Sequence, residues 1–148
     1  EQKRVFSMIP ALRNAEFVRY GVMHRNTFLD SPRLLDATYA LKSEPRIRFA
    51  GQMTGVEGYI ESTASGWTAG VAAAMEVLGR PMPQLDRFTA VGALASYISD
   101  HTVTKFQPMN INFGIIEPLG YKIKGKREKN AKISERALER IESLKGEL

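Results

Sequence analysis

Apolar residues recur at helical spacing in several stretches of the chain. Residues 59–78 contain no proline and many alanines, and Gly79 follows them, so the sequence predicts a helix there. Residues 89–99 predict a second helix, because apolar residues return every three or four positions. Residues 133–144 place their apolar side chains on one face, which predicts a closing amphipathic helix.

Two shorter apolar stretches favour strands. Residues 16–26 alternate loosely between apolar and polar side chains, and residues 47–50 form a brief apolar run. The second run leads into a glycine-rich loop, which is followed by the helix expected from residue 59. The sequence therefore predicts a strand, a glycine loop and a helix in direct succession.

The glycine loop is the most informative feature of the sequence. Gly51, Gly55 and Gly58 lack the Cβ atoms that would block close approach, and they permit positive φ angles. The helix start that follows offers unpaired N–H donors and the positive end of the helix dipole, which favour negative charge. Taken alone, the loop indicates a site for a dinucleotide or another anion. Glycines that serve only tight packing would give the same pattern, and this alternative stays open.

Composition limits the classes of protein. The chain has 148 residues, of which 43% are hydrophobic and 25% are charged, the balance of a soluble globular domain. No apolar run is long enough to cross a bilayer, and a cytoplasmic location is expected. The chain has no cysteine, which excludes disulfides and thiolate ligands, and its two histidines are far apart in sequence. We therefore expect no metal site.

The net charge is +5, and much of the excess lies in residues 122–132, here called the basic segment. Its basic residues are Lys122, Lys124, Lys126, Arg127, Lys129 and Lys132. Glu128 is its only acidic residue. Two interpretations stay open: a solvated linker ahead of the last helix, or a contact to RNA phosphates.

A short polar run follows the first predicted strand. His24, Arg25 and Asn26 are adjacent and offer donors and acceptors to a planar ring or a phosphate. His24 is also suited to moving protons near neutral pH, although the sequence does not supply its partner. Solvated residues at the end of a strand would look the same.

Residues 106–114 mix aromatic rings with amides. Phe106 and Phe113 are suited to stacking, and Asn110 and Asn112 are suited to reading the edge of a base or a pterin. An ordered loop that covers the core would use the same residue types. The sequence alone leaves both interpretations open.

Three segments in this order closely resemble the folate-dependent tRNA (uracil-5-)-methyltransferases, the TrmFO family. They are residues 19–27, with Tyr-Gly-Val-Met-His-Arg-Asn; residues 49–66, around the glycine loop; and residues 106–114, with Phe-Gln-Pro-Met-Asn-Ile-Asn-Phe-Gly. The resemblance runs from about residue 9 to about residue 119. It identifies the chain with the C-terminal part of such a protein.

The resemblance implies an α/β fold, as a fragment of a flavoprotein with two dinucleotide-binding, Rossmann-like domains and with C-terminal helices. Residues 1–119 would form the C-terminal part of the FAD-binding domain, and residues 120–148 would add the basic segment and the amphipathic helix. The implied activity is methylation of uracil C5 in the T-loop of tRNA. In that family methylenetetrahydrofolate supplies the one-carbon unit, reduced FAD supplies the reducing equivalents, and NAD(P)H regenerates the flavin.

The resemblance also implies site residues. The flavin neighbours are carried over to Gly51, Gln52, Gly55, Gly58, Tyr59 and Glu61. The folate and substrate contacts are carried over to His24, Arg25, Asn26, Asn110 and Asn112. Among these, His24 is the candidate catalytic residue.

The sequence departs from the family's pattern in two respects. Its loop glycines are spaced Gly-x-x-x-Gly-x-x-Gly, so the Gly-x-Gly-x-x-Gly finger for the ADP half of FAD is not found here. The cysteine chemistry attributed to the family also has no residue in this chain. We therefore expect the chain alone to be inactive, with the N-terminal half of the same protein and tRNA as its partners.

Two other functions stay open. A GidA-type flavoprotein that modifies the tRNA wobble uridine shares the Ala-Gly-Gln and Gly-Tyr-x-Glu arrangement, although residues 24–26 and 106–114 argue against it. A non-catalytic RNA-binding module would use the basic segment instead. A bound flavin in the absorbance spectrum would favour an enzyme, and a colourless protein with salt-sensitive tRNA binding would favour the module.

Overall fold

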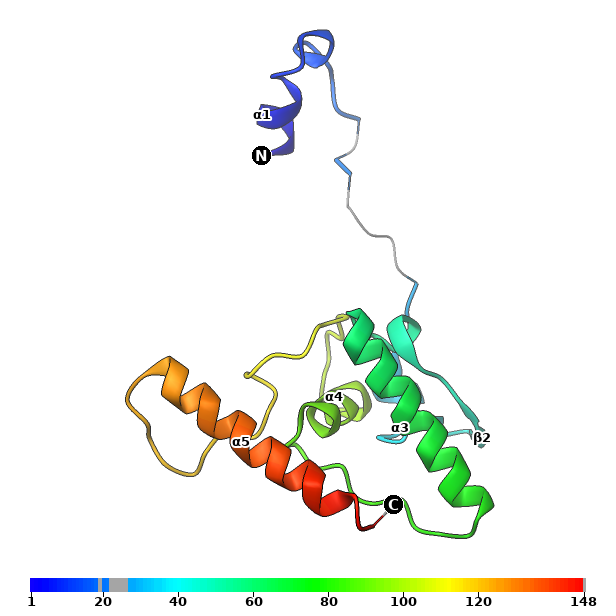
Figure 1. The fold of residues 1–148 in the computed structure, drawn as a ribbon. Coiled ribbons are helices and arrows are strands. Elements are labelled where there is room, and N and C mark those ends of the chain that lie inside the picture. The colour runs from blue at the N-terminus through cyan, green and yellow to red at the C-terminus, as the bar shows by residue number, and fades with distance from the viewer. Residues whose placement is uncertain (19, 22–26, 148) are drawn as a thin grey trace.

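The computed structural model describes residues 1–18, 20–21 and 27–147. These residues form a mixed, mostly helical fold with a small sheet (Figure 1). In chain order the elements are α1 (Gln2–Phe6), η1 (Pro10–Leu12), α2 (Ser31–Leu34), β1 (Ala40–Leu41), β2 (Glu44–Arg48), η2 (Gly51–Thr54), α3 (Tyr59–Val77), α4 (Ala90–Ser99) and α5 (Lys126–Leu144).

The sheet is smaller than the predicted α/β fold requires. It has two antiparallel strands, with Ala40 opposite Arg48 and Leu41 opposite Glu44. Antiparallel neighbours are joined by a tight turn, whereas a Rossmann-like sheet needs parallel strands joined by long crossovers. The α/β prediction therefore holds only in a coarser form for the described residues, as helices around one short hairpin.

The predicted strand over residues 16–26 is wrong where the structure describes it. Residues 16–18, 20 and 21 are not in a strand. The aromatic rings of this segment pack locally instead, because Phe17 stacks on Phe6 and on Tyr20 with ring centroids 5.7 and 5.6 Å apart. The aromatic side chains that the alternating pattern predicted to lie in a strand therefore stack on one another.

Helix α3 begins and ends at glycines, as the sequence predicts. Gly58 at its N-cap has a φ of 100°, and Gly79 after its last turn has a φ of 65°. The N–H groups of Gly79 and Arg80 donate to the carbonyls of Glu76 and Met75 at 3.1 and 2.9 Å. These two bonds form a Schellman motif, which satisfies carbonyls that the helix leaves unpaired.

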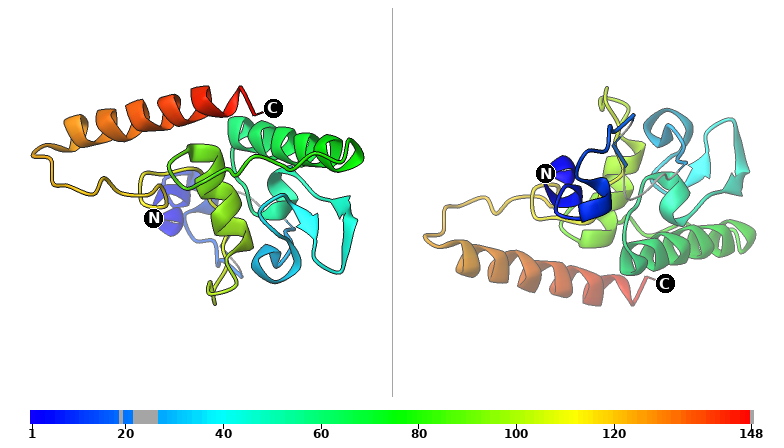
Figure 2. Two further views of the ribbon diagram at one scale, coloured as in Figure 1. Left: turned by 90° about the horizontal axis from the view of Figure 1, so that it is seen from below. Right: turned by 90° about the horizontal axis from the view of Figure 1, so that it is seen from above.

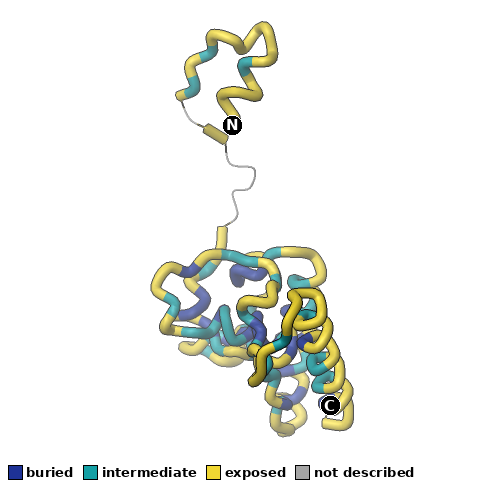
Figure 3. Tube along the Cα trace, turned by 90° about the vertical axis from the view of Figure 1, so that its left-hand side faces the viewer, coloured by how far each residue is buried: buried dark blue, intermediate teal, exposed yellow. Residues whose placement is uncertain are grey.

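The main core joins α3 and α4 to the segments before them and to Phe106 after α4. Its buried members are Leu35, Tyr39, Val56, Ala69, Leu94, Ala95, Ile98 and Phe106. Burial raises the pKa of the Tyr39 phenol well above its usual range, so this side chain stays neutral. The buried positions start at Ser31, and the described residues before it are exposed or half-buried (Figure 3).

Helix α5 is longer than predicted and includes the second half of the basic segment. It packs through Ile133 against Ala93 of α4 and Ile116. Its C-terminal end comes near α3 (Figure 2), where Trp67 and Leu144 line one small cavity.

Polar contacts also hold α5 in place. Arg140 forms an ion pair with Asp86 at 2.7 Å, and the Arg136 guanidinium lies 4.5 Å from the centroid of the Phe88 ring. Within the described part of the chain, no helix is long and apolar enough to cross a membrane.

Candidate functional site

The glycine loop between β2 and α3 takes conformations that only glycine adopts readily. Gly51, Gly55 and Gly58 have φ angles of 71°, 84° and 100°. The N–H of Gly51 donates to Oγ of Ser65 on α3 at 2.7 Å, and the Thr54 hydroxyl donates to the Gly51 carbonyl at 2.7 Å. The first bond holds the loop on α3, and the second lies within η2.

Gly55 makes room for an aromatic ring. A Cβ atom added to Gly55 would overlap Cζ of Phe106 and lie 2.6 Å from its Cε1. The buried Phe106 ring also meets the rings of Phe28 and Tyr97, with centroids 6.0 and 5.4 Å away. The packing explanation that the sequence left open therefore accounts for Gly55.

Replacing Gly55 by alanine is expected to destabilise the protein by about 2–5 kcal/mol, from left-handed strain and from overpacking against Phe106. Gly79→Ala is the matched control, because Gly79 also has a positive φ but an added Cβ there meets nothing within 4 Å. It should cost only the strain, about 1–2 kcal/mol. Urea unfolding measures both losses, and equal losses would show that Phe106 moves aside freely.

The segment that contains Met109 lies along the glycine loop, although 53 residues separate Asn110 from Glu57 in the sequence. Val56 and Met109 form an isolated parallel bridge. The Glu57 N–H donates to the Met109 carbonyl, and the Met109 N–H donates to the Gly55 carbonyl, both at 3.0 Å. The Asn110 side-chain amide adds a bond to the Glu57 carbonyl at 3.1 Å. The two motifs therefore form one unit.

Glu61, in the first turn of α3, completes this unit. Its Oε1 accepts a hydrogen bond from the Ile111 N–H at 3.3 Å. A Cβ atom on Gly58 would overlap Oε2 of Glu61 and lie 2.9 Å from Nδ2 of Asn110. Gly58 therefore leaves the space in which the Glu61 carboxylate and the Asn110 amide approach the start of α3.

The start of α3 is open to its surroundings. Gly58 is exposed, and Tyr59 and Ile60 are 94% and 81% exposed. Among the described residues, no side chain caps this helix end through a hydrogen bond. The first N–H groups of a helix need a partner outside the helix, such as water, another chain segment or a ligand. This helix end is therefore able to receive an electron-rich group.

Other predicted site residues are placed differently. Gln52 is exposed within η2. Asn112 shapes its own turn, because its Oδ1 accepts from the Gly114 N–H at 2.9 Å and its Nδ2 donates to the Asn110 carbonyl at 3.2 Å. The remaining predicted site residues, His24, Arg25 and Asn26, lie outside the described residues. The structure thus brings together Gly58, Glu61 and Asn110.

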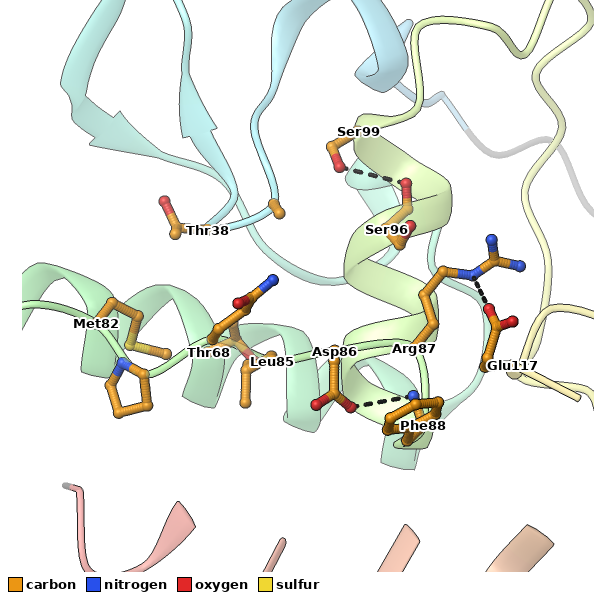
Figure 4. Close-up of a pocket in the computed structure, with 13 residues that line it drawn as sticks. Thr38, Thr68, Met82, Leu85, Asp86, Arg87, Phe88, Ser96, Ser99 and Glu117 are labelled. Carbon is orange, nitrogen blue, oxygen red and sulfur yellow. Dashed lines mark hydrogen bonds and ion pairs between the residues drawn. The ribbon is translucent and has the colours of Figure 1, made fainter. Parts of the chain in front are cut away.

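A large cavity lies elsewhere. It measures about 690 Å³ and is lined by parts of α3, α4 and residues 82–88 (Figure 4). None of the predicted site residues lines it. Its charged groups already have partners, since Asp86 pairs with Arg140 at 2.7 Å and Arg87 lies 3.9 Å from Glu117. We therefore place the candidate site at the helix start rather than in this cavity.

No motif in residues 82–88 marks a cavity in the sequence. The described residues also hold no group of three or more His, Asp or Glu side chains that could bind a metal ion. The contacts that sequence reasoning missed are the Gly55–Phe106 packing and the Val56–Met109 bridge. Their only signal in the sequence was an apolar residue within each motif, Val56 in the glycine loop and Met109 in residues 106–114.

Comparison with known proteins covers both motifs of this unit. The family described as Glucose inhibited division protein A (GidA) matches residues 1–81, which include the glycine loop and α3. Proteins named methylenetetrahydrofolate–tRNA-(uracil-5-)-methyltransferase TrmFO match nearly the whole chain. The one from Acetivibrio thermocellus is 60% identical over 138 residues, which is 93% of this chain and 32% of that protein.

Two further relatives agree. TrmFO from Listeria monocytogenes serovar 1/2a is 54% identical over 148 residues, which is 100% of this chain and 34% of that protein. TrmFO from Streptococcus agalactiae is 58% identical over 146 residues, which is 97% of this chain and 33% of that protein. The chain spans about one third of the length of the curated relatives it matches. It therefore belongs to the GidA family and, within that family, to the TrmFO proteins.

Proposed function

We propose that this chain forms the flavin-ring and folate side of the site in which a full-length TrmFO protein methylates C5 of the T-loop uridine in tRNA. Full-length protein means this chain together with the polypeptide that precedes it in a protein of its relatives' length. The proposal rests on one observation above all: residues 55–57 pair with residues 109–110 beside an exposed helix start, in a chain 54% to 60% identical to TrmFO proteins. The names of those relatives favour this function over modification of the wobble uridine.

The start of α3 fits the ring end of FAD. Its uncapped N–H groups and the helix dipole favour the electron-rich pyrimidine edge of the ring. Gly58 leaves room for the Glu61 carboxylate and the Asn110 amide beside the helix start, and Glu61 accepts a hydrogen bond from the neighbouring Ile111 N–H. Gly51 and Gly55 contribute by shaping the loop. FAD, when bound, supplies reducing equivalents that NAD(P)H restores.

The folate and uracil contacts are assigned on the resemblance. Asn110 is exposed beside Gly58, where its amide is able to read the edge of a pterin or a uracil. His24, Arg25 and Asn26 are assigned to the folate and uracil contacts on the resemblance alone. Asn112 acts indirectly, because it shapes the turn that carries Asn110.

One face of α3 supports a large partner. Ile60, Trp67 and Val77 are 81%, 46% and 87% exposed. Cβ atoms added to Gly66 and Gly70 would meet nothing within 4 Å. Exposed apolar faces mark surfaces that another structural unit covers. We infer that the N-terminal half of the full-length protein packs here and supplies the ADP half of the FAD site.

Replacing His24 by alanine in the full-length protein is expected to lower methylation by about 100-fold or more, the usual cost of losing a general acid or base. The flavin absorbance spectrum should stay normal, because the glycine loop is unchanged. Asn26→Ala should also lower activity while leaving the spectrum unchanged. The matched control is His101→Ala, which removes an exposed histidine distant in sequence. Equal activity of the His24→Ala variant and the parent would remove His24 from the mechanism.

A further inference from the structure

A cavity of about 420 Å³ lies where α5 begins. Phe113 and Gly114 line one part of it, and Lys126, Lys129 and Asn130 line another. These residues come from two segments that no sequence pattern connects. Phe113 belongs to the segment that pairs with the glycine loop, and the lysines belong to the basic segment. The structure therefore places an aromatic ring and two cations around one space.

The groups that line this cavity are accessible. The Phe113 side chain is 45% exposed. Lys126 and Lys129 are exposed as well. Among the described residues, neither lysine takes part in an ion pair, whereas Lys132 one turn further along α5 pairs with Glu135 at 2.7 Å. The cavity thus combines a partly exposed ring with two lysines that form no ion pair among the described residues.

We propose that this cavity takes one nucleotide of a bound RNA, with its base stacked on Phe113 and its phosphate against Lys126 and Lys129. Aromatic stacking of an unpaired base next to basic residues is a common mode of single-stranded RNA binding. This proposal rests on the proposed function, because it takes the bound RNA to be tRNA.

The charge outside the cavity favours RNA over a small anion. Lys122, Lys124 and Arg127 continue the positive charge beyond the cavity, and Glu128 is the only acid in the basic segment. A chain of phosphates contacts such an extended surface, whereas a dicarboxylate such as the glutamate end of a folate needs only the two lysines. The cavity is therefore a nucleotide site that adds base stacking to the phosphate contacts of the basic segment.

The test measures binding of a labelled tRNA transcript to the full-length protein at several salt concentrations, without folate or reductant. Phe113→Leu should weaken binding about 5- to 150-fold with an unchanged salt slope, because stacking on one base is lost. Lys126→Gln with Lys129→Gln should lower the slope of log affinity against log salt by about 0.7 to 1.4, for one or two phosphate contacts. A variant with all three changes should lose less affinity than the product of the separate fold-losses, because the three side chains contact one nucleotide.

Matched controls come from the same chain. Tyr121→Leu removes an exposed aromatic ring from outside this cavity. Lys42→Gln with Lys145→Gln removes the same charge from outside the basic segment, where Lys42 donates to the Pro32 carbonyl and Lys145 pairs with Glu142. Both controls should change binding by less than about 2-fold, the small effect expected of side chains outside a contact. Equal effects in the controls, or unchanged binding in Phe113→Leu, would overturn the proposal.

Two further results distinguish this proposal from a folate site in the same cavity and from the proposed function. If the lysine variant loses affinity for methylenetetrahydrofolate and keeps its tRNA binding, the cavity holds the folate tail and the RNA proposal is wrong. If the parent protein binds tRNA with the expected variant effects but transfers no methyl group, the nucleotide site stands and the proposed function fails.

Discussion

Replacing Gly58 by valine in the full-length protein is expected to abolish flavin binding, with a loss of affinity of at least about 100-fold, or 2.7 kcal/mol. Gly58 has a φ of 100° and a ψ of 148°, a conformation open essentially to glycine alone. A side chain there would also overlap the Glu61 carboxylate and crowd the Asn110 amide. The displaced groups would cover the N–H donors at the start of α3. FAD titration and the absorbance spectrum measure the loss.

The matched control is Gly79→Val, at the other end of the same helix. Gly79 also has a positive φ, of 65°, and an added Cβ there meets nothing within 4 Å. Both variants should lose about 1–3 kcal/mol of stability from backbone strain, measured by urea unfolding. Only Gly58→Val should lose the flavin. Normal flavin binding by a folded Gly58→Val variant would show that the loop is structural.

The chain by itself is expected to bind FAD too weakly to be purified with it and to transfer no methyl group to tRNA. The start of α3 offers donors for the ring end only, whereas the pyrophosphate needs a second glycine finger and helix start. The exposed apolar face of α3 also lacks its cover. Adding the preceding polypeptide should restore stoichiometric flavin.

The comparison requires the two proteins to be purified side by side, with far-UV circular dichroism as the control for folding of the shorter one. A shorter chain that is folded and colourless agrees with the proposal. A yellow, active preparation of the shorter chain would contradict it, because the ring end alone would then suffice.

Helices α3 and α4 were predictable from the sequence because their ends carry local signals. Gly58 and Gly79 bound α3, and Thr89 caps α4 by accepting a hydrogen bond from the Gly92 N–H at 3.0 Å. Such signals act within one turn, so a single sequence shows them. The start of α5 at Lys126 carries no comparable signal in the sequence, because the glycine ahead of it, Gly125, lies within a run of lysines.

The site was predictable only in its parts. The glycine loop and residues 106–114 were both singled out, but their pairing through Val56 and Met109 depends on contacts distant in sequence. Glu61 was assigned to the flavin by resemblance, whereas the structure gives it a bond to Ile111. The spacing of residues within one motif indicates which of its side chains lie on the same side. It does not indicate which distant segment of the chain packs against them.

The Rossmann-like sheet was the largest difference. The loosely alternating pattern of residues 16–26 suggested a strand, yet Phe17 and its aromatic neighbours pack on one another. Alternation predicts a strand only when a sheet offers an edge to pair with. The sheet of the described residues is a two-stranded antiparallel hairpin.

The most direct test of the proposed function follows an isotopic label. Methylenetetrahydrofolate labelled in its methylene carbon is incubated with the full-length protein, tRNA and NAD(P)H, and the label in the T-loop uracil is measured. The proposal predicts that label appears at C5 and that Gly58→Val, which lacks the flavin, transfers none. Label in uracil from S-adenosylmethionine instead, or transfer at the parent rate by Gly58→Val, would contradict it.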